Sequence, residues 1–185
     1  MTEKKSFEVK VTLLEGVEVH VQNNHVTIKG PRGEVSRTFV SPRLVLTKED
    51  SLLNIKTKES LRAIKYDKTL GHTFRAHLRN MMYGVLKGYE AKLKICSGHF
   101  PMTVSTDTEK VTIKNFLGEK VPRHSSMMKG VEVKVNGNEV IVTGIEKEAV
   151  GQTAARIEQS CRITNRDRRI FQDGIWIIQK PQVKE

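Results

Sequence analysis

At positions 26 to 34 the sequence reads VTIKGPRGE, and at positions 111 to 119 it reads VTIKNFLGE. Six of these nine positions are identical, and the differences fall in the middle, where Pro31 is replaced by Phe116. Each copy begins with the apolar alternation of a strand and then reaches a glycine suited to a turn. The near-identity predicts that the chain contains one folding unit twice.

A second echo follows in the same order. Leu70-Gly71-His72-Thr73 in the first half parallels Val150-Gly151-Gln152-Thr153 in the second. The two echoes are offset by 85 and 80 positions, so the units are about 85 to 90 residues long and differ by a few residues of loop. We expect the boundary near Gly88 to Glu90, which gives a first domain over residues 1–89 and a second over 90–185.

Alternating apolar residues predict several strands in each half. In the first half we expect them at 7–11, 17–21, 26–28, 38–46 and 52–55, with a tight turn at Asn23-Asn24. In the second half we expect them at 91–95, 102–104, 111–113, 131–135, 140–142 and 174–178.

Apolar residues then recur at helical spacing in each half. The first helix has a stripe of Leu70, Phe74, Leu78, Met81 and Val85, and its opposite side carries His72, Arg75 and Arg79. The second helix has the stripe Val150, Thr153, Ala154, Ile157 and Cys161. The sequence therefore predicts an α+β chain of two tandem homologous domains, each a mostly antiparallel β-sheet with one helix packed on a face.

The charge balance indicates a polyanionic partner. The chain has 32 Lys and Arg against 21 Asp and Glu, a net charge of +11 and a pI near 9.7. A membrane surface is the main competitor, but no apolar run approaches the ~20 residues that would span a bilayer. The first ten residues lack the apolar region of a secretory signal, so we expect none. Two cysteines make no disulfide framework and favour a reducing compartment.

The sequence offers little for catalysis or metal binding. Cys96 and His99 are spaced like zinc ligands, but a structural site needs four ligands and Cys161 stands alone. The sequence has neither a phosphate-binding glycine loop with its lysine nor a nucleophile elbow. We therefore expect no catalytic residue, no metal, no cofactor and no small-molecule substrate.

Two basic segments stand out in the second half. Positions 114 to 124 read KNFLGEKVPRH and are expected to form a loop, and Arg162, Arg166, Arg168 and Arg169 fall within eight residues. Arginine suits forked contacts with phosphate oxygens, and loops can follow the irregular backbone of folded RNA. A solvated run of charge is the alternative reading of either segment alone.

Specific motifs also accompany these segments. They are His99-Phe100-Pro101, Asn115–Lys120 and Asn165–Ile175, with Val26–Gly33 and His77–Gly88 in the first half. In these stretches, and over nearly its whole length, the chain resembles the universal sixth protein family of the large ribosomal subunit, known as the ninth large-subunit protein in eukaryotes. The first two motifs point to the eukaryotic and archaeal branch.

The resemblance implies a duplicated fold and a structural role in the cytosolic ribosome, with a nucleolar stage during assembly. It implies that the second domain is the main rRNA-binding domain and docks near the sarcin–ricin loop and the factor-binding region. The implied partners are large-subunit rRNA and ribosomal proteins near the stalk base, with elongation factors nearby and no membrane. By this resemblance, the rRNA-binding residues are Lys114, Asn115, Lys120, Arg123, His124, Arg156, Arg166, Arg168 and Arg169.

Two other functions remain open at this point. An RNA-acting enzyme would need a poised acid–base pair or a cofactor loop, and neither is found. A protein-interaction module could use the helix face of His72, Arg75 and Arg79, which we regard as a candidate protein or RNA face. We hypothesise that the first domain contacts less RNA than the second, although their net charges are similar, +6 for residues 1–90 and +5 for the rest.

Overall fold

The computed structural model describes residues 7–49, 52–58, 61 and 63–184. It divides into two compact units, unit 1 (Met1–Lys87) and unit 2 (Gly88–Glu185). The domain limits expected from the repeat, 1–89 and 90–185, stay a prediction. The expectation that the chain begins without a secretory signal falls mostly on residues 1–6, outside the described residues.

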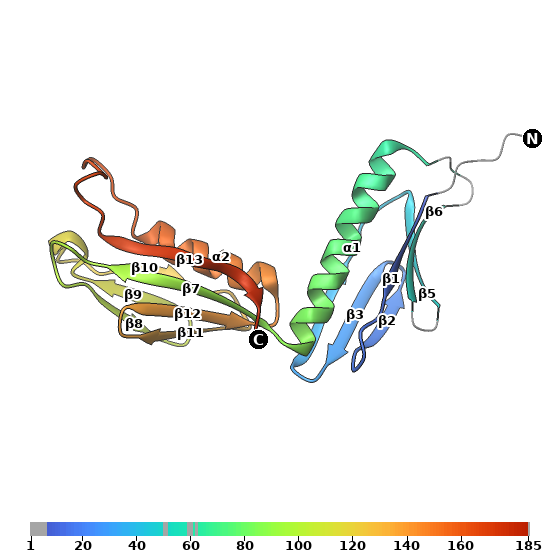
Figure 1. The fold of residues 1–185 in the computed structure, drawn as a ribbon, viewed down its shortest axis with the longest axis horizontal. Coiled ribbons are helices and arrows are strands. Elements are labelled where there is room, and N and C mark those ends of the chain that lie inside the picture. Colours follow the sequence, from blue (N-terminus) through green and yellow to red (C-terminus); the bar gives the residue numbers. More distant parts are fainter. Residues whose placement is uncertain (1–6, 50–51, 59–60, 62, 185) are drawn as a thin grey trace, which may run out of the picture. The chain divides into compact units, whose positions relative to one another are not determined.

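Unit 1 consists of two small sheets and one long helix (Figure 1). Its elements are β1 (Glu8–Thr12), β2 (Glu18–Gln22), β3 (His25–Gly30), β4 (Gly33–Thr38), β5 (Leu44–Glu49), β6 (Leu52–Thr57) and α1 (Lys65–Leu86). The sheets have the strand orders β1-β6-β5 and β2-β3-β4, and all their described ladders are antiparallel. Helix α1 packs against β1, β3 and β6, so it covers both sheets.

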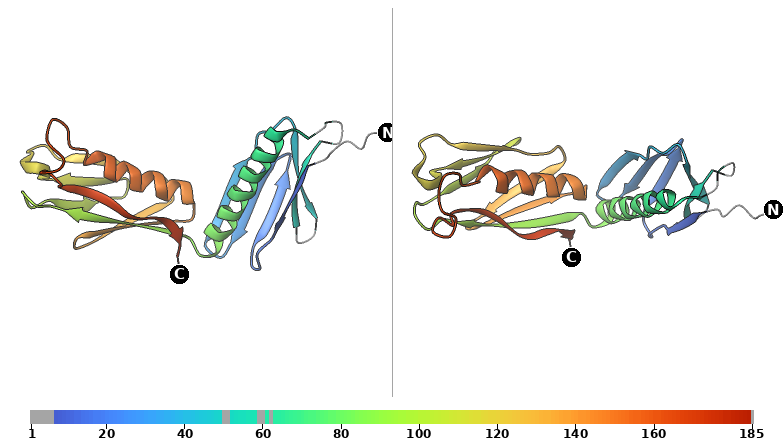
Figure 2. Two further views of the ribbon diagram at one scale, coloured as in Figure 1. Left: turned by 45° about the horizontal axis from the view of Figure 1, so that its top comes forward. Right: turned by 90° about the horizontal axis from the view of Figure 1, so that it is seen from above.

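Unit 2 repeats this plan and adds to it (Figure 2). Its elements are β7 (Tyr89–Cys96), β8 (Thr103–Thr106), β9 (Lys110–Lys114), the 3₁₀ turn η1 (Phe116–Gly118), β10 (Arg123–Ser126), β11 (Val131–Asn136), β12 (Glu139–Gly144), α2 (Lys147–Ser160) and β13 (Gly174–Val183). The strand orders are β11-β12-β7-β13 and β10-β9-β8, again antiparallel in every described ladder.

The two units correspond strand by strand. The order β1-β6-β5 recurs as β7-β12-β11, the order β2-β3-β4 recurs as β8-β9-β10, and a helix follows in each unit. The repeated sequence begins on equivalent strands, β3 and β9, and then runs into the start of β4 in unit 1 and into η1 in unit 2. Strand β13 has no counterpart among the described residues of unit 1 and pairs with the edge of β7 that β12 leaves open. The predicted α+β fold of two tandem domains is confirmed, and each unit divides its strands over two sheets.

The helices bury the stripes that their spacing predicts. On α1, Phe74, Leu78, Met81 and Val85 are buried, whereas Leu70 is half-buried. In the second unit all five stripe residues are buried, four of them on α2 and the fifth, Cys161, directly after its end. A large apolar side chain contributes about 1.5 to 3 kcal/mol on full burial, so these stripes hold each helix on its sheets. No helix in the described part is both long and apolar enough to cross a bilayer.

The first turn of α1 rests on a buried carboxylate. Asp67 accepts the Ile64 backbone N–H at 3.0 Å and two guanidinium N–H groups of Arg43, at 2.8 and 3.1 Å. The hydrogen bonds from Arg43 lower the pKa of Asp67, and they outweigh the opposing effect of burial. This pair ties the beginning of the helix to the turn before β5.

Two sequence predictions of local structure are wrong. The strand expected over 38–46 is interrupted, because Ser41 Oγ accepts the N–H groups of Arg43 and Leu44 and so closes a turn beside Pro42. The segment 114–124 was expected to be a loop throughout, but it ends in β10, which begins at Arg123. Strand β10 reads RHSS and has no apolar alternation, so periodicity could not detect it.

Candidate nucleic-acid interface

Three connecting segments of unit 2 converge at one end of its four-stranded sheet. They are residues 97–102 after β7, residues 115–122 before β10, and residues 161–173 before β13. The first and third meet because Cys96 and Gly174 are paired in the ladder of β7 and β13. The second joins them because Asn115 Nδ2 donates to the carbonyl oxygen of Pro101 at 2.9 Å.

Asp173 is the anchor between the first and third segments. It is 3% exposed, and its Oδ1 accepts the backbone N–H groups of Gly98 at 2.6 Å and His99 at 3.0 Å. Its Oδ2 lies 2.5 Å from Nδ1 of His99. Burial acts to raise the pKa of Asp173, but the hydrogen bonds from His99 and Gly98 and the charge of His99 outweigh it, so the pKa is lowered. The anchor is therefore an ionised carboxylate at neutral pH.

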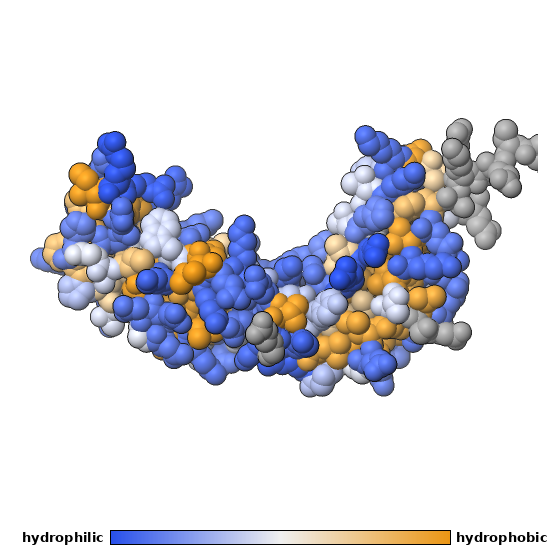
Figure 3. Space-filling model, in the orientation of Figure 1, coloured by the Kyte–Doolittle hydropathy of each residue, from blue (hydrophilic) through white to orange (hydrophobic). Residues whose placement is uncertain are grey.

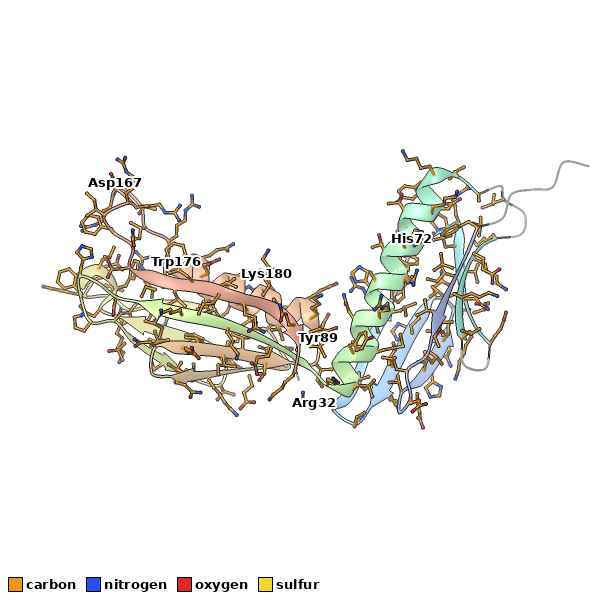
Figure 4. The ribbon with its side chains drawn as sticks, viewed as in Figure 1. Arg32, His72, Tyr89, Asp167, Trp176 and Lys180 are labelled. Atoms are coloured by element: carbon orange, nitrogen blue, oxygen red, sulfur yellow. The ribbon has the colours of Figure 1, made fainter. Side chains whose placement is uncertain are left out.

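Aromatic contacts extend this anchor into the third segment. The rings of His99 and Phe171 stack with centroids 4.8 Å apart, and the guanidinium of Arg166 lies 4.9 Å from the Phe171 centroid. Trp176 Nε1 donates to the Gln172 carbonyl at 3.2 Å, and Figure 4 labels this side chain on β13. The segment of residues 161–173 is thus held at its base by His99 of the first segment and Trp176 of β13.

Arg123 fixes the second segment to the end of α2. Its Nε and Nη2 donate to both carboxylate oxygens of Glu119, at 2.8 and 2.6 Å. Its Nη1 donates to the carbonyl oxygens of Ser160 at 2.9 Å and Arg162 at 3.1 Å, and the guanidinium lies 4.3 Å from the Phe116 centroid. The hydrogen bonds from Arg123 lower the pKa of Glu119. These contacts make Arg123 an organiser of the loop, and its predicted rRNA contact stays a prediction.

The arginines of the third segment face outward. Arg166, Arg168 and Arg169 are exposed, and Asp167 accepts hydrogen bonds from the Arg169 guanidinium. Figure 4 labels Asp167 at the tip of this segment, and Figure 3 shows hydrophilic side chains gathered there. The guanidinium carbon of Arg168 lies 5.7 Å from the Trp176 ring centroid, so this side chain lies near the start of β13. The structure therefore brings these three predicted residues together on one anchored loop.

The remaining predicted residues lie on or beside the small sheet. Lys114 and Lys120 are exposed, at the end of β9 and in the second segment. His124 is exposed on β10, with Nδ1 3.2 Å from Thr112 Oγ1. Arg156 is half-buried on α2 and donates to Ser126 Oγ at 3.2 Å, which joins the helix to β10. Asn115 adopts a left-handed conformation, φ 60°, and leads the chain into η1.

Sequence reasoning gave no role to the anchor itself. Asp173, His99 and Phe171 lie in the quoted motifs, but the contacts of His99 with Asp173 and Phe171 join residues 74 and 72 positions apart in the chain. The one local signal in the sequence was the glycine that directly follows Asp173. A Cβ at Gly174, where φ is 156°, would lie 3.3 Å from the Trp176 ring, so a glycine follows the anchor for a local reason.

The site has the chemistry of binding. Within the described residues no three His, Cys, Asp or Glu side chains gather as metal ligands. Cys161 is buried, and burial raises the pKa of its thiol. Exposed guanidinium and ammonium groups on these anchored segments can donate hydrogen bonds to phosphate oxygens. On unit 1, the predicted outward face of α1 is exposed at His72, Arg75 and Arg79.

Comparison with known proteins gives a consistent result. A family model described as ribosomal protein L6 matches residues 15–88 and 100–174, one match in each repeat. The chain is 45% identical over 171 residues to the large ribosomal subunit protein uL6 of Methanobrevibacter smithii, covering 92% of this chain and 94% of that protein. It is 44% identical to the protein of the same name from Methanosarcina mazei, covering 92% and 95%. The corresponding protein of Desulfurococcus amylolyticus is 45% identical, with 92% and 93% covered.

Proposed function

The chain belongs to the ribosomal protein L6 family of the large ribosomal subunit, and from this premise we propose that unit 2 binds large-subunit rRNA near the sarcin–ricin loop and the factor-binding region. The family consists of structural proteins and not of enzymes, so the alternative of an RNA-acting enzyme is set aside. The relatives are ribosomal proteins, which implies a cytoplasmic ribosome.

The anchored loop of residues 161–173 carries this proposal. A flexible basic loop would lose conformational freedom on binding RNA, whereas this one is already held by Asp173 and by the stacked rings of His99 and Phe171. Its exposed guanidinium groups are therefore presented to a ligand in a limited set of positions. Irregular RNA is recognised largely through its shape and phosphates, which such a surface can follow.

The proposal assigns different roles to the predicted residues. Direct contact with rRNA is proposed for Arg166, Arg168 and Arg169 and for the exposed Lys114, Lys120 and His124. Asn115, Arg123 and Arg156 have protein partners and would hold the surface in shape while remaining beside it. Stalk-base proteins and elongation factors as neighbours, and passage through the nucleolus during assembly, belong to the same proposal.

The salt dependence of RNA binding tests it. The probe is a large-subunit rRNA fragment containing the sarcin–ricin loop, titrated at several salt concentrations with the full chain. Arg168→Ala combined with Arg169→Ala should weaken binding and reduce the slope of log K against log salt by about two, one for each lost phosphate contact. The matched control is Arg75→Ala with Arg79→Ala, which removes the same charge from unit 1.

The two double variants separate the outcomes. The proposal expects the control to leave the slope unchanged. Equal slopes for all three proteins would mean that the third segment of unit 2 does not contact phosphate. A reduced slope in the control alone would move the RNA interface to α1 and overturn the assignment to unit 2.

A further inference from the structure

Unit 1 has a groove between the edge of β1 and one side of α1. Its volume is about 210 Å³. It is lined from the strand side by Lys10, Val11, Thr12 and Leu14, and from the helix side by Arg75, Arg79, Met82 and Tyr83. Strand β1 is the first strand in the order β1-β6-β5, so one of its edges has no neighbouring strand among the described residues. The groove therefore combines an open strand edge with a basic helix side.

The register of the ladder identifies the free backbone groups. Thr57 N–H donates to the carbonyl of Phe7, so the residues of β1 whose backbone groups face β6 are Phe7 and every second residue after it. The backbone N–H and C=O groups of Glu8, Lys10 and Thr12 consequently point away from β6. An open edge of this kind is a template for another extended segment.

Unit 2 fills the equivalent position with its own strand. Strand β7 corresponds to β1, and its second edge is paired with β13, which also packs against α2. Helix α2 holds that strand through its side chains, because Glu158 Oε1 accepts the N–H of Ile177 at 3.0 Å. A Cβ at Gly151 would lie 3.3 Å from Pro181 of β13. The space between helix and sheet edge thus accepts an extended strand in this fold.

The charges of the groove differ between the units. By the offset of 80 that relates Gly71 to Gly151, Arg75 and Arg79 occupy the positions of Ala155 and Gln159. Both arginines are exposed, and Arg79 lies 6.0 Å from the ring centroid of Tyr83. The acidic residue of β1, Glu8, already has two basic partners. Its Oε1 lies 4.0 Å from Nζ of Lys10 and 3.5 Å from Nζ of Lys56. The groove of unit 1 therefore favours an acidic occupant, whereas in unit 2 the uncharged Ala155 and Gln159 lie on the helix beside β13, whose one charged residue is Lys180.

We propose that the groove of unit 1 is a docking site for an extended acidic peptide segment of a partner protein. The segment pairs as an additional strand with the backbone groups of Lys10 and Thr12. Its acidic side chains meet Arg75 and Arg79, and an apolar side chain packs on Leu14 and the ring of Tyr83, which are both half-buried. A peptide fits better than RNA because only a peptide backbone can complete the β1 edge. The proposal goes beyond rRNA binding and does not depend on it.

The test is a nuclear magnetic resonance titration of the full ¹⁵N-labelled chain with a synthetic peptide of alternating Glu and Val. We expect saturable shifts at the amides of Lys10 and Thr12 and slower hydrogen exchange there. Arg75→Glu with Arg79→Glu should weaken binding at least about tenfold, because both charges at the rim are reversed. The matched control, Lys65→Glu with Lys68→Glu, makes the same charge change on α1 outside the groove and should have little effect.

A second variant tests the strand pairing separately from charge. Lys10→Pro removes an N–H that points away from β6, so it should keep the β1–β6 ladder and yet reduce peptide binding more than Lys10→Ala. An equal loss in the control helix variant would mean diffuse attraction and would overturn the proposal. The proposal would also fail if the peptide did not slow hydrogen exchange at the amides of Lys10 and Thr12. If oligouridylate displaced the peptide and its own binding were unchanged by Lys10→Pro, the groove would be assigned to RNA.

Discussion

Units 1 and 2 share a topology but differ at the hairpin that carries the repeated sequence. In unit 1 the strands β3 and β4 are joined within Gly30–Gly33, whereas in unit 2 the chain runs through residues 115–122 between β9 and β10. Unit 2 also has the segment 161–173 and strand β13, which have no equivalent in the described part of unit 1. The two units therefore share their strand order and helix, and unit 2 differs by longer connecting segments that form a basic surface at one end.

Each unit also uses one buried aspartate in a different way. In unit 1, Asp67 binds Arg43 and the first turn of α1, and so it secures an element of the fold. In unit 2, Asp173 binds the backbone before β8 and so secures loops that carry exposed arginines. The same chemistry therefore stabilises the fold in one unit and presents a surface in the other.

The largest difference between the units should appear on removing an arginine near the repeat hairpin. Arg123→Ala leaves the Ser160 and Arg162 carbonyls and the Glu119 carboxylate without their donor, so we expect unit 2 to lose about 2 to 3 kcal/mol of unfolding free energy. Urea unfolding followed by the fluorescence of Trp176, the single tryptophan, measures it.

Arg32→Ala is the control in unit 1. Arg32 is exposed in the short hairpin and donates to the Lys87 carbonyl, so we expect a loss below about 0.5 kcal/mol, measured by circular dichroism of the helices. Equal losses in the two variants would contradict the view that the longer connection of unit 2 needs an internal anchor.

The next effect concerns the site more than the fold. Asp173→Asn keeps the shape of the side chain but removes the charge beside His99, so we expect a stability loss of about 1 to 2 kcal/mol. The loosened loop should bind the rRNA fragment about tenfold more weakly. Asp67→Asn in unit 1 is the comparison, and RNA affinity that falls equally in both variants would sink the distinction between the two carboxylates.

Acid should weaken both carboxylate anchors. The pKa of Asp67 is lowered chiefly by its hydrogen bonds to Arg43, and that of Asp173 is lowered by hydrogen bonds that outweigh burial. A lowered folded-state pKa contributes stability that is present above the ordinary aspartate pKa of 3.8 and is lost as the pH falls through the lower folded value. We expect the urea concentration at the unfolding midpoint to decrease once the pH is below about 4. The decrease should be smaller in either Asp→Asn variant. If the dependence of the urea midpoint on pH were unchanged in both variants, Asp67 and Asp173 would not be the source of the acid sensitivity.

The parts of the fold that the sequence predicted are those with a periodic apolar pattern. Both helices and most strands have one, and the repeat indicated two units because identical strands recur in order. Strands β4 and β10 were not predicted because they are largely polar and have no regular apolar alternation. Local pattern carries no signal where tertiary contacts form the strand.

The same limit applied to the site. Clustered arginines in residues 162–169 are visible in sequence, so the basic loop could be predicted. Whether an arginine is exposed, like Arg168, or engaged internally, like Arg123, depends on carbonyls and carboxylates supplied by other elements. The anchoring role of Asp173 likewise follows from its distance to His99 in space.

The smallest predicted effect isolates backbone geometry from RNA contact. Gly118, the last glycine of the repeated sequence in unit 2, has φ 79°, and its matched control Gly130 has φ 74°. Alanine is strained at such angles, so Gly118→Ala and Gly130→Ala should each cost about 1 kcal/mol in urea unfolding. A Cβ at Gly118 would lie 3.4 Å from the Phe100 ring, in ordinary contact, whereas nothing lies within 4 Å at Gly130.

Their effects on RNA should nevertheless differ. Gly118 lies in the connection that carries Lys120, so Gly118→Ala should displace that lysine and weaken binding of the rRNA fragment by about threefold, close to one surface contact. Gly130→Ala should leave RNA affinity unchanged, because its turn precedes β11. Equal RNA affinities at equal stability loss would mean that the second connecting segment lies outside the interface, and the proposed contacts would then reduce to the arginine loop.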